Sequence, residues 1–128
     1  MNYKLRIARP VSDLSRATKM YCEGLGLEML SSFTDHEGFD GVMLGSPGAS
    51  YHFEFTHCRA HPIIPTPTEE DMIVFYIPDK TEWSLTCERM ITAGFEPVDS
   101  LNPYWDKQGR TFSDSDGYRI VLQRGCWG

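Results

Sequence analysis

Short segments in which apolar and polar residues alternate recur along the chain, and each of them predicts a β-strand. In the first half these segments cover residues 4–9, 27–33, 39–44 and 51–57. In the second half they cover residues 71–77, 95–98, 109–115 and 118–124. Each half of the chain therefore predicts a small β-sheet.

A helical spacing of apolar residues follows the first strand in each half. Leu14, Ala17 and Tyr21 recur at this spacing and predict a helix from Asp13 to about Glu23, with Ser12 as the N-cap. In the second half, Asp79 is the predicted N-cap and Glu82 completes a capping box. The apolar stripe of this second helix consists of Trp83, Cys87, Met90 and Ile91.

The same order of elements, βαβββ, thus occurs twice, which indicates an internal duplication. We predict an α+β fold of two tandem βαβββ modules whose curved sheets surround a cleft. The domain is predicted to span residues 1–128, with modules at 1–57 and 71–128. A proline-rich segment at 58–70 has no periodicity and is the predicted linker.

The strands predict one apolar face and one mixed face in each sheet. In 51–57, Phe53 and Phe55 oppose His52 and Glu54, since side chains two residues apart share a face. An ordinary sheet with one face in water shows the same alternation. The mixed faces also carry Met72, Val74, Tyr76 and Val121. Because binding sites combine apolar and polar groups, we expect a ligand cleft there.

Composition narrows the classes of partner. The 128 residues include 12 Lys and Arg against 18 Asp and Glu, a net charge of −6, without the basic run of a nucleic-acid binder. There is no apolar run of membrane-spanning length and no signal-peptide pattern, so we expect a cytoplasmic protein that binds neither nucleic acid nor membranes. The four cysteines include no CxxC pair and are expected to be reduced thiols.

Several motifs, in this order, resemble the vicinal-oxygen-chelate superfamily, which includes glyoxalase I, bleomycin-resistance proteins and extradiol dioxygenases. They are VSDL (11–14), Tyr21, GLGL (24–27) and DSDGYRIVL (114–122), within the duplicated βαβββ order. NPYWD (102–106) is similar to uncharacterised glyoxalase-like members. The resemblance implies two modules that form a cleft, often completed by homodimerisation, so a homodimer is expected.

Metal-dependent members of the superfamily place ligands on the first and last strands of each module. Carried onto this sequence, the resemblance puts these positions at Arg6, Glu54, Met72 and Val121. Of these four, only Glu54 suits a hard or borderline cation. A dication about 5 Å from Arg6 would be repelled by roughly 6–7 kcal/mol at an effective dielectric of about 20. We therefore predict that an Arg6–Glu54 ion pair replaces the metal and that no cofactor is bound.

Other residues complete the predicted site. His52 shares the face of Glu54, so a displaced divalent metal at His52 and Glu54 is an alternative, although a further ligand would be needed. Tyr76 offers a phenol on the face of Met72. Tyr104 and Trp105 follow Pro103 in a predicted loop, where they either stack on a ligand or cover the end of the core.

Two functions follow from these residues. The first is a metal-free small-molecule binding protein of the bleomycin-resistance type, whose ligand is partly anionic or carbonyl-rich because it meets Arg6. The alternative is a glyoxalase-like lyase or isomerase, or a dioxygenase-type enzyme, in which Glu54 is the catalytic acid or base. The missing metal ligands, and an arginine that makes Glu54 a weaker base, favour the binding protein.

Overall fold

The computed structural model describes residues 2–127, so the first and last residues of the predicted domain lie outside it. The chain forms two compact units that divide between Pro65 and Thr66. Each unit contains one four-stranded sheet. The predicted α+β fold with two βαβββ modules is confirmed.

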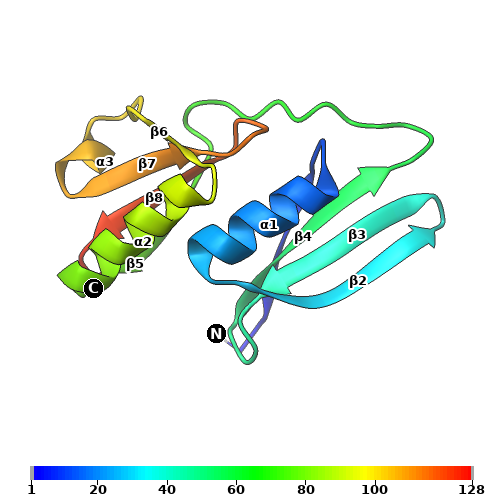
Figure 1. Cartoon of the computed structure of the whole chain (residues 1–128), viewed down its shortest axis with the longest axis horizontal. Helices are drawn as coiled ribbons and strands as arrows, with labels where there is room; N and C mark the ends of the chain where they lie inside the picture. Colours follow the sequence, from blue (N-terminus) through cyan, green and yellow to red (C-terminus); the bar gives the residue numbers. More distant parts are fainter. Residues whose placement is uncertain (1, 128) are drawn as a thin grey trace. The chain divides into compact units, whose positions relative to one another are not determined.

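The first unit is built around a mixed sheet with strand order β1-β4-β3-β2 (Figure 1). β1 runs parallel to β4, and the other pairs are antiparallel. The elements are β1 (Leu5–Pro10), α1 (Leu14–Leu25), β2 (Glu28–His36), β3 (Phe39–Gly45) and β4 (Tyr51–Cys58). The parallel pair places the N-terminal strand beside the last strand of the module.

The second unit repeats this topology with strand order β5-β8-β7-β6. Its edge strand β6 is only three residues long, whereas the corresponding β2 has nine. The elements are β5 (Met72–Ile77), α2 (Lys80–Thr92), β6 (Glu96–Val98), α3 (Tyr104–Lys107), β7 (Gly109–Ser113) and β8 (Arg119–Arg124). The added α3 lies between the edge strand and β7 in the sequence (Figure 1).

Aromatic side chains form the core between α1 and the first sheet. Tyr21, Phe53 and Phe55 are completely buried. The Tyr21 ring meets the Phe55 ring edge to face, with centroids 4.8 Å apart. This is the apolar face that the alternation in β4 predicted, since Phe53 and Phe55 lie two residues apart.

The core of the second unit lies between α2 and its sheet. Cys87 and Met90 of α2 are buried, as are Phe112, Ile120 and Leu122 of the strands. Trp83 of α2 donates a hydrogen bond from Nε1 to the carbonyl oxygen of Leu122, at 2.8 Å. Ile91, which was expected in the apolar stripe, is instead 45% exposed, because it turns away from the buried side of α2.

The start of α1 differs from the expectation. Asp13, not Ser12, is the N-cap, and its carboxylate accepts a hydrogen bond from the backbone N–H of Arg16 at 3.0 Å. Asp13 has the extended backbone that a capping residue needs, so the helix begins at Leu14. The second cap is confirmed, because Asp79 accepts hydrogen bonds from the N–H groups of Thr81 and Glu82.

The segment around Tyr104 and Trp105 is a helical turn rather than the predicted loop. The Asn102 side chain accepts a hydrogen bond from the N–H of Tyr104 at 3.0 Å. The carbonyl groups of Asn102 and Pro103 accept from the next residues of α3. An asparagine before a proline stabilises a turn start, and this local hydrogen bonding explains the difference.

Candidate functional site

Three polar side chains gather on the face of the first sheet that α1 does not cover. In the parallel pairing of β1 and β4, Arg6 lies opposite His52 and Ala8 lies opposite Glu54. The burial pattern separates this face from the buried face of Phe53 and Phe55. We call Arg6, His52 and Glu54 the polar triad.

The guanidinium of Arg6 joins the triad together. Its Nε donates a hydrogen bond to Nε2 of His52 at 2.9 Å. Its Nη1 lies 3.5 Å from Oε2 of Glu54, so the predicted ion pair is present. In this contact Nε2 of His52 is the acceptor, because a guanidinium has only donors.

Exposure differs within the polar triad. The Arg6 side chain is 48% exposed, whereas that of Glu54 is 17% exposed. A pair this open to water contributes little to stability. The carboxylate therefore lies deeper in the sheet face and the guanidinium is the part that a solute reaches first.

Two glycines of β3 make room for side chains of the adjacent strands β2 and β4. Gly45 lies opposite His52, and a Cβ on it would stand 3.0 Å from the Cβ of His52. A Cβ on Gly41 would overlap the ring of Phe33, its partner on β2. Sequence reasoning missed both glycines; their spacing in β3, Gly41 and Gly45 on the same face as Met43, was the available signal.

The predicted residues of the second unit share one face of its sheet. Met72, Val74 and Tyr76 alternate along β5, and Val121 lies opposite Val74. Tyr76 is 40% exposed, but Val121 is completely buried. On α3, the rings of Tyr104 and Trp105 pack edge to face with centroids 4.9 Å apart. A ligand-binding role for Met72, Tyr76, Val121, Tyr104 and Trp105 stays a prediction.

The residues at the expected chelating positions do not fit a metal ion. Nε2 of His52 is occupied by the Arg6 hydrogen bond, and the guanidinium charge stands beside Glu54. Within residues 2–127, no group of three or more His, Cys, Asp and Glu side chains could hold a metal. Zinc sites in proteins use at least three such ligands.

A second charged cluster closes the β2–β3 hairpin. Arg59 donates to both oxygens of the Asp40 carboxylate at 2.9–3.2 Å and lies 3.6 Å from Asp35. Asp40 also accepts a hydrogen bond from the N–H of Asp35. The Arg59 hydrogen bonds, followed by that backbone bond, lower the pKa of Asp40 below its usual value. Sequence reasoning did not single out this cluster.

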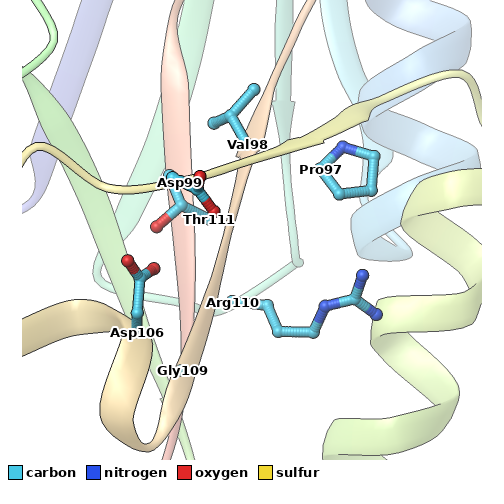
Figure 2. Close-up of a pocket in the computed structure, with 7 residues that line it drawn as sticks. All are labelled: Pro97, Val98, Asp99, Asp106, Gly109, Arg110 and Thr111. Carbon is cyan, nitrogen blue, oxygen red and sulfur yellow. The ribbon is translucent and has the colours of Figure 1, made fainter. Parts of the chain in front are cut away.

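The second unit contains a pocket of about 540 Å³ where β6 and β7 separate next to α3 (Figure 2). Its lining residues are Pro97, Val98, Asp99, Asp106, Gly109, Arg110 and Thr111. In Figure 2 the carboxylates of Asp99 and Asp106 lie on the same side as Thr111, whereas the Arg110 side chain extends away from them. The gap exists because the pairing of β6 with β7 ends at Val98 and Thr111.

Comparison with known proteins identifies the family. The model of the YycE-like N-terminal domain matches residues 5–56, and that of the YycE-like C-terminal domain matches residues 70–124. The uncharacterised protein YycE of Bacillus subtilis (strain 168) is 41% identical over 119 residues, which cover 93% of this chain and 86% of the relative. The chain belongs to the YycE-like family.

Solved structures agree with this assignment. A crystal structure of the Bacillus subtilis YycE protein, whose function is unknown and which is provisionally grouped with glyoxalases and fosfomycin resistance proteins, has a TM-score of 0.89 to this YycE-like chain. The two are 39% identical, and the match covers 98% of this chain and 90% of the other.

More distant structures show the fold alone. Glyoxalase I of Leishmania major has a TM-score of 0.73 at 22% identity, covering 98% of this chain and 88% of that one. TnmS3, an antibiotic-binding protein from Streptomyces sp. CB03234, has a TM-score of 0.65 at 21% identity, with 98% of each chain covered. The predicted resemblance to the vicinal-oxygen-chelate superfamily is confirmed.

The helices of this YycE-like protein are short. Between residues 2 and 127, none is both long and apolar enough to cross a lipid bilayer.

Proposed function

We propose that this YycE-like protein binds a small molecule through a carboxylate or carbonyl-rich group at Arg6, without a metal ion. The observation that carries the proposal is the Arg6–His52 hydrogen bond together with the Arg6–Glu54 ion pair. These contacts take up the groups that would otherwise chelate a cation, and they hold the guanidinium in place.

The guanidinium keeps capacity for a ligand. Arginine has five N–H donors, and the contacts with His52 and Glu54 use two of them, which leaves three. A guanidinium presents donors in a fixed fork that matches a carboxylate. Because its side chain is 48% exposed, a dissolved anion can reach it.

Sequestration is the form of binding that we favour. TnmS3 binds an antibiotic on a similar fold, and no catalytic step is needed for a protein that only withholds a ligand. A homodimer and a cytoplasmic location remain predictions made from the sequence.

The test is a thermal-shift screen with paired variants. The probes are sodium pyruvate, fosfomycin, the methylglyoxal–glutathione adduct, catechol and zinc chloride. A ligand that binds only the folded state raises Tm. We expect at least one oxygen-rich anion to raise the Tm of wild type and of Arg16→Gln, a charge-matched control on the exposed side of α1, but not of Arg6→Gln.

Two results would contradict the proposal. One is an anion that stabilises Arg6→Gln as strongly as wild type. The other is stoichiometric zinc, nickel or iron in protein purified without a histidine tag, because a metal centre would then exist in the native protein.

An enzyme is the second candidate, favoured by the position of Glu54. Its carboxylate is largely shielded from water and lies beside a cation that could stabilise an enolate. Turnover of the methylglyoxal–glutathione adduct by wild type, lost in Glu54→Gln, would support this function. Ligand binding without turnover in both proteins would support sequestration.

A further inference from the structure

We infer that the pocket between β6, β7 and α3 binds an organic cation through an alkylammonium or guanidinium group. This inference is independent of the polar triad, because every lining residue belongs to the second unit. It rests on the chemistry of the groups around the pocket, which accept hydrogen bonds and carry negative charge.

Two carboxylates define the charge of the pocket. Asp106 is held in place because both of its oxygens accept from the N–H of Ser100, at 3.3 and 3.2 Å. Within residues 2–127, the Asp99 carboxylate has no hydrogen bond or ion pair, although its backbone carbonyl accepts from Arg119. One acid is therefore fixed and the other is available to a ligand.

Two arginines lie near these acids: Arg119 donates to the backbone carbonyl of Asp99 rather than to its carboxylate, and the guanidinium of Arg110 is directed elsewhere. Its guanidinium carbon lies 5.4 Å from the centre of the Phe112 ring, in cation–π contact. Arg110 and Phe112 alternate with Gly109 and Thr111 along β7, so they lie on the opposite face of the sheet. Figure 2 shows the Arg110 side chain extending away from Asp99 and Asp106.

A buried amide supplies an independent sign of a missing donor. Gln123 is only 8% exposed, and its Oε1 has no hydrogen-bond partner among the described residues. Buried oxygens of this kind are nearly always satisfied in folded proteins. An unsatisfied acceptor points to a donor that binds from outside the chain.

The side-chain amide of Gln123 points at Gly109, which lines the pocket. Gln123 lies opposite Gly109 in the β7–β8 pairing, and its Oε1 is 2.5 Å from where a Cβ on Gly109 would stand. The carbonyl oxygen of Trp105 lies 2.7 Å from the same point. Both acceptors therefore lie directly behind Gly109, which has no side chain and lines the pocket.

The size of the pocket favours an organic cation over a metal ion. A volume of about 540 Å³ lies in the range of small-molecule sites, roughly 300–1,000 Å³. Calcium requires six to eight oxygen ligands close together. Asp106 already accepts two hydrogen bonds from Ser100, so too few oxygens remain for a cation of that kind.

The test uses agmatine, which carries an ammonium at one end and a guanidinium at the other. Binding is followed by isothermal titration calorimetry and by backbone amide shifts in two-dimensional NMR of the full chain. The variants are Asp99→Asn and the control Glu88→Gln, which removes the same charge from an exposed position on α2. Succinate and calcium chloride are titrated in parallel.

We expect agmatine to bind wild type and to shift amide signals of residues 98–111. Asp99→Asn should weaken binding at least about tenfold, since it removes a charge-assisted hydrogen bond, and Glu88→Gln should change it less than about twofold. Equal weakening by both variants would overturn the inference, because it would show general attraction to a negative protein. Absence of agmatine binding, or saturation by calcium alone, would overturn it as well.

Discussion

The two modules share one topology but place their polar groups differently. In the first, β2 pairs with β3 along most of its nine residues, and the polar triad lies on β1 and β4. In the second, β6 has three residues, and the acidic pocket opens where it leaves β7. The register positions that match Arg6 and Glu54 carry Met72 and Val121 instead. A duplicated backbone thus fixes where side chains stand, while edge-strand length decides where a pocket forms.

The largest expected effect tests whether the two cores are equally important. Phe55→Ala in the first module and Phe112→Ala in the second each remove a ring that is completely buried. Each should lower the free energy of unfolding by about 3–5 kcal/mol, because a cavity remains. Urea denaturation measures this loss, and Tyr104→Ala, at a site that is 53% exposed, is the control. If only one of the two variants lost little free energy of unfolding, the core of that module would be able to repack around the cavity.

The second prediction concerns the chelating position of the first module. Arg6→His removes the cation and supplies an imidazole next to His52 and Glu54, which makes three donors suited to zinc. With free zinc at one hundred times Kd, the variant should gain about 2.7 kcal/mol of stability. Thermal unfolding with and without zinc measures this gain. A zinc stabilisation of wild type or of Arg16→His as large as that of Arg6→His would contradict the explanation that Arg6 excludes the metal.

A third prediction compares two glycines that face neighbouring side chains. Gly109→Ala would bring a Cβ against the Trp105 carbonyl and Gln123, and should cost about 1–3 kcal/mol. Gly45→Ala in the first module meets its nearest atom, the Cβ of His52, at 3.0 Å and should cost less. Urea midpoints of the two variants check the order. The reverse order would mean that the residues around Gly109 move aside more easily than His52 does.

The smallest expected effect is the pH dependence of the hairpin cluster in the first module. The pKa of Asp40 is lower in the folded state than in the unfolded state. The stability that its carboxylate contributes is therefore fully present above the unfolded pKa of about 3.9, and it is lost as the pH falls through the folded pKa. The Tm difference between wild type and Asp40→Asn should be constant from about pH 7 to 5 and shrink below about pH 4. Calorimetry over this range measures it. A difference that grows in acid would contradict the assignment.

The polar triad could be predicted from the sequence because side chains alternate between the two faces of a strand. His52 and Glu54 had to share a face of β4, and the resemblance placed Arg6 on the adjacent strand. The Arg6–His52 hydrogen bond was not predicted, since rotamers decide which nitrogen meets which acceptor. The pocket was not predicted either, because Asp99, Asp106 and Gly109 carry no shared periodicity and meet only through α3.

The sequence by itself determined the two βαβββ modules and their buried faces, because the alternation of apolar and polar residues is a local property. Only the tertiary structure decided that Gln123 is an unsatisfied acceptor behind Gly109 and that Arg110 turns away from the acids. Those facts depend on register between strands and on where an edge strand ends. Both are set by the packing of distant segments rather than by any one of them.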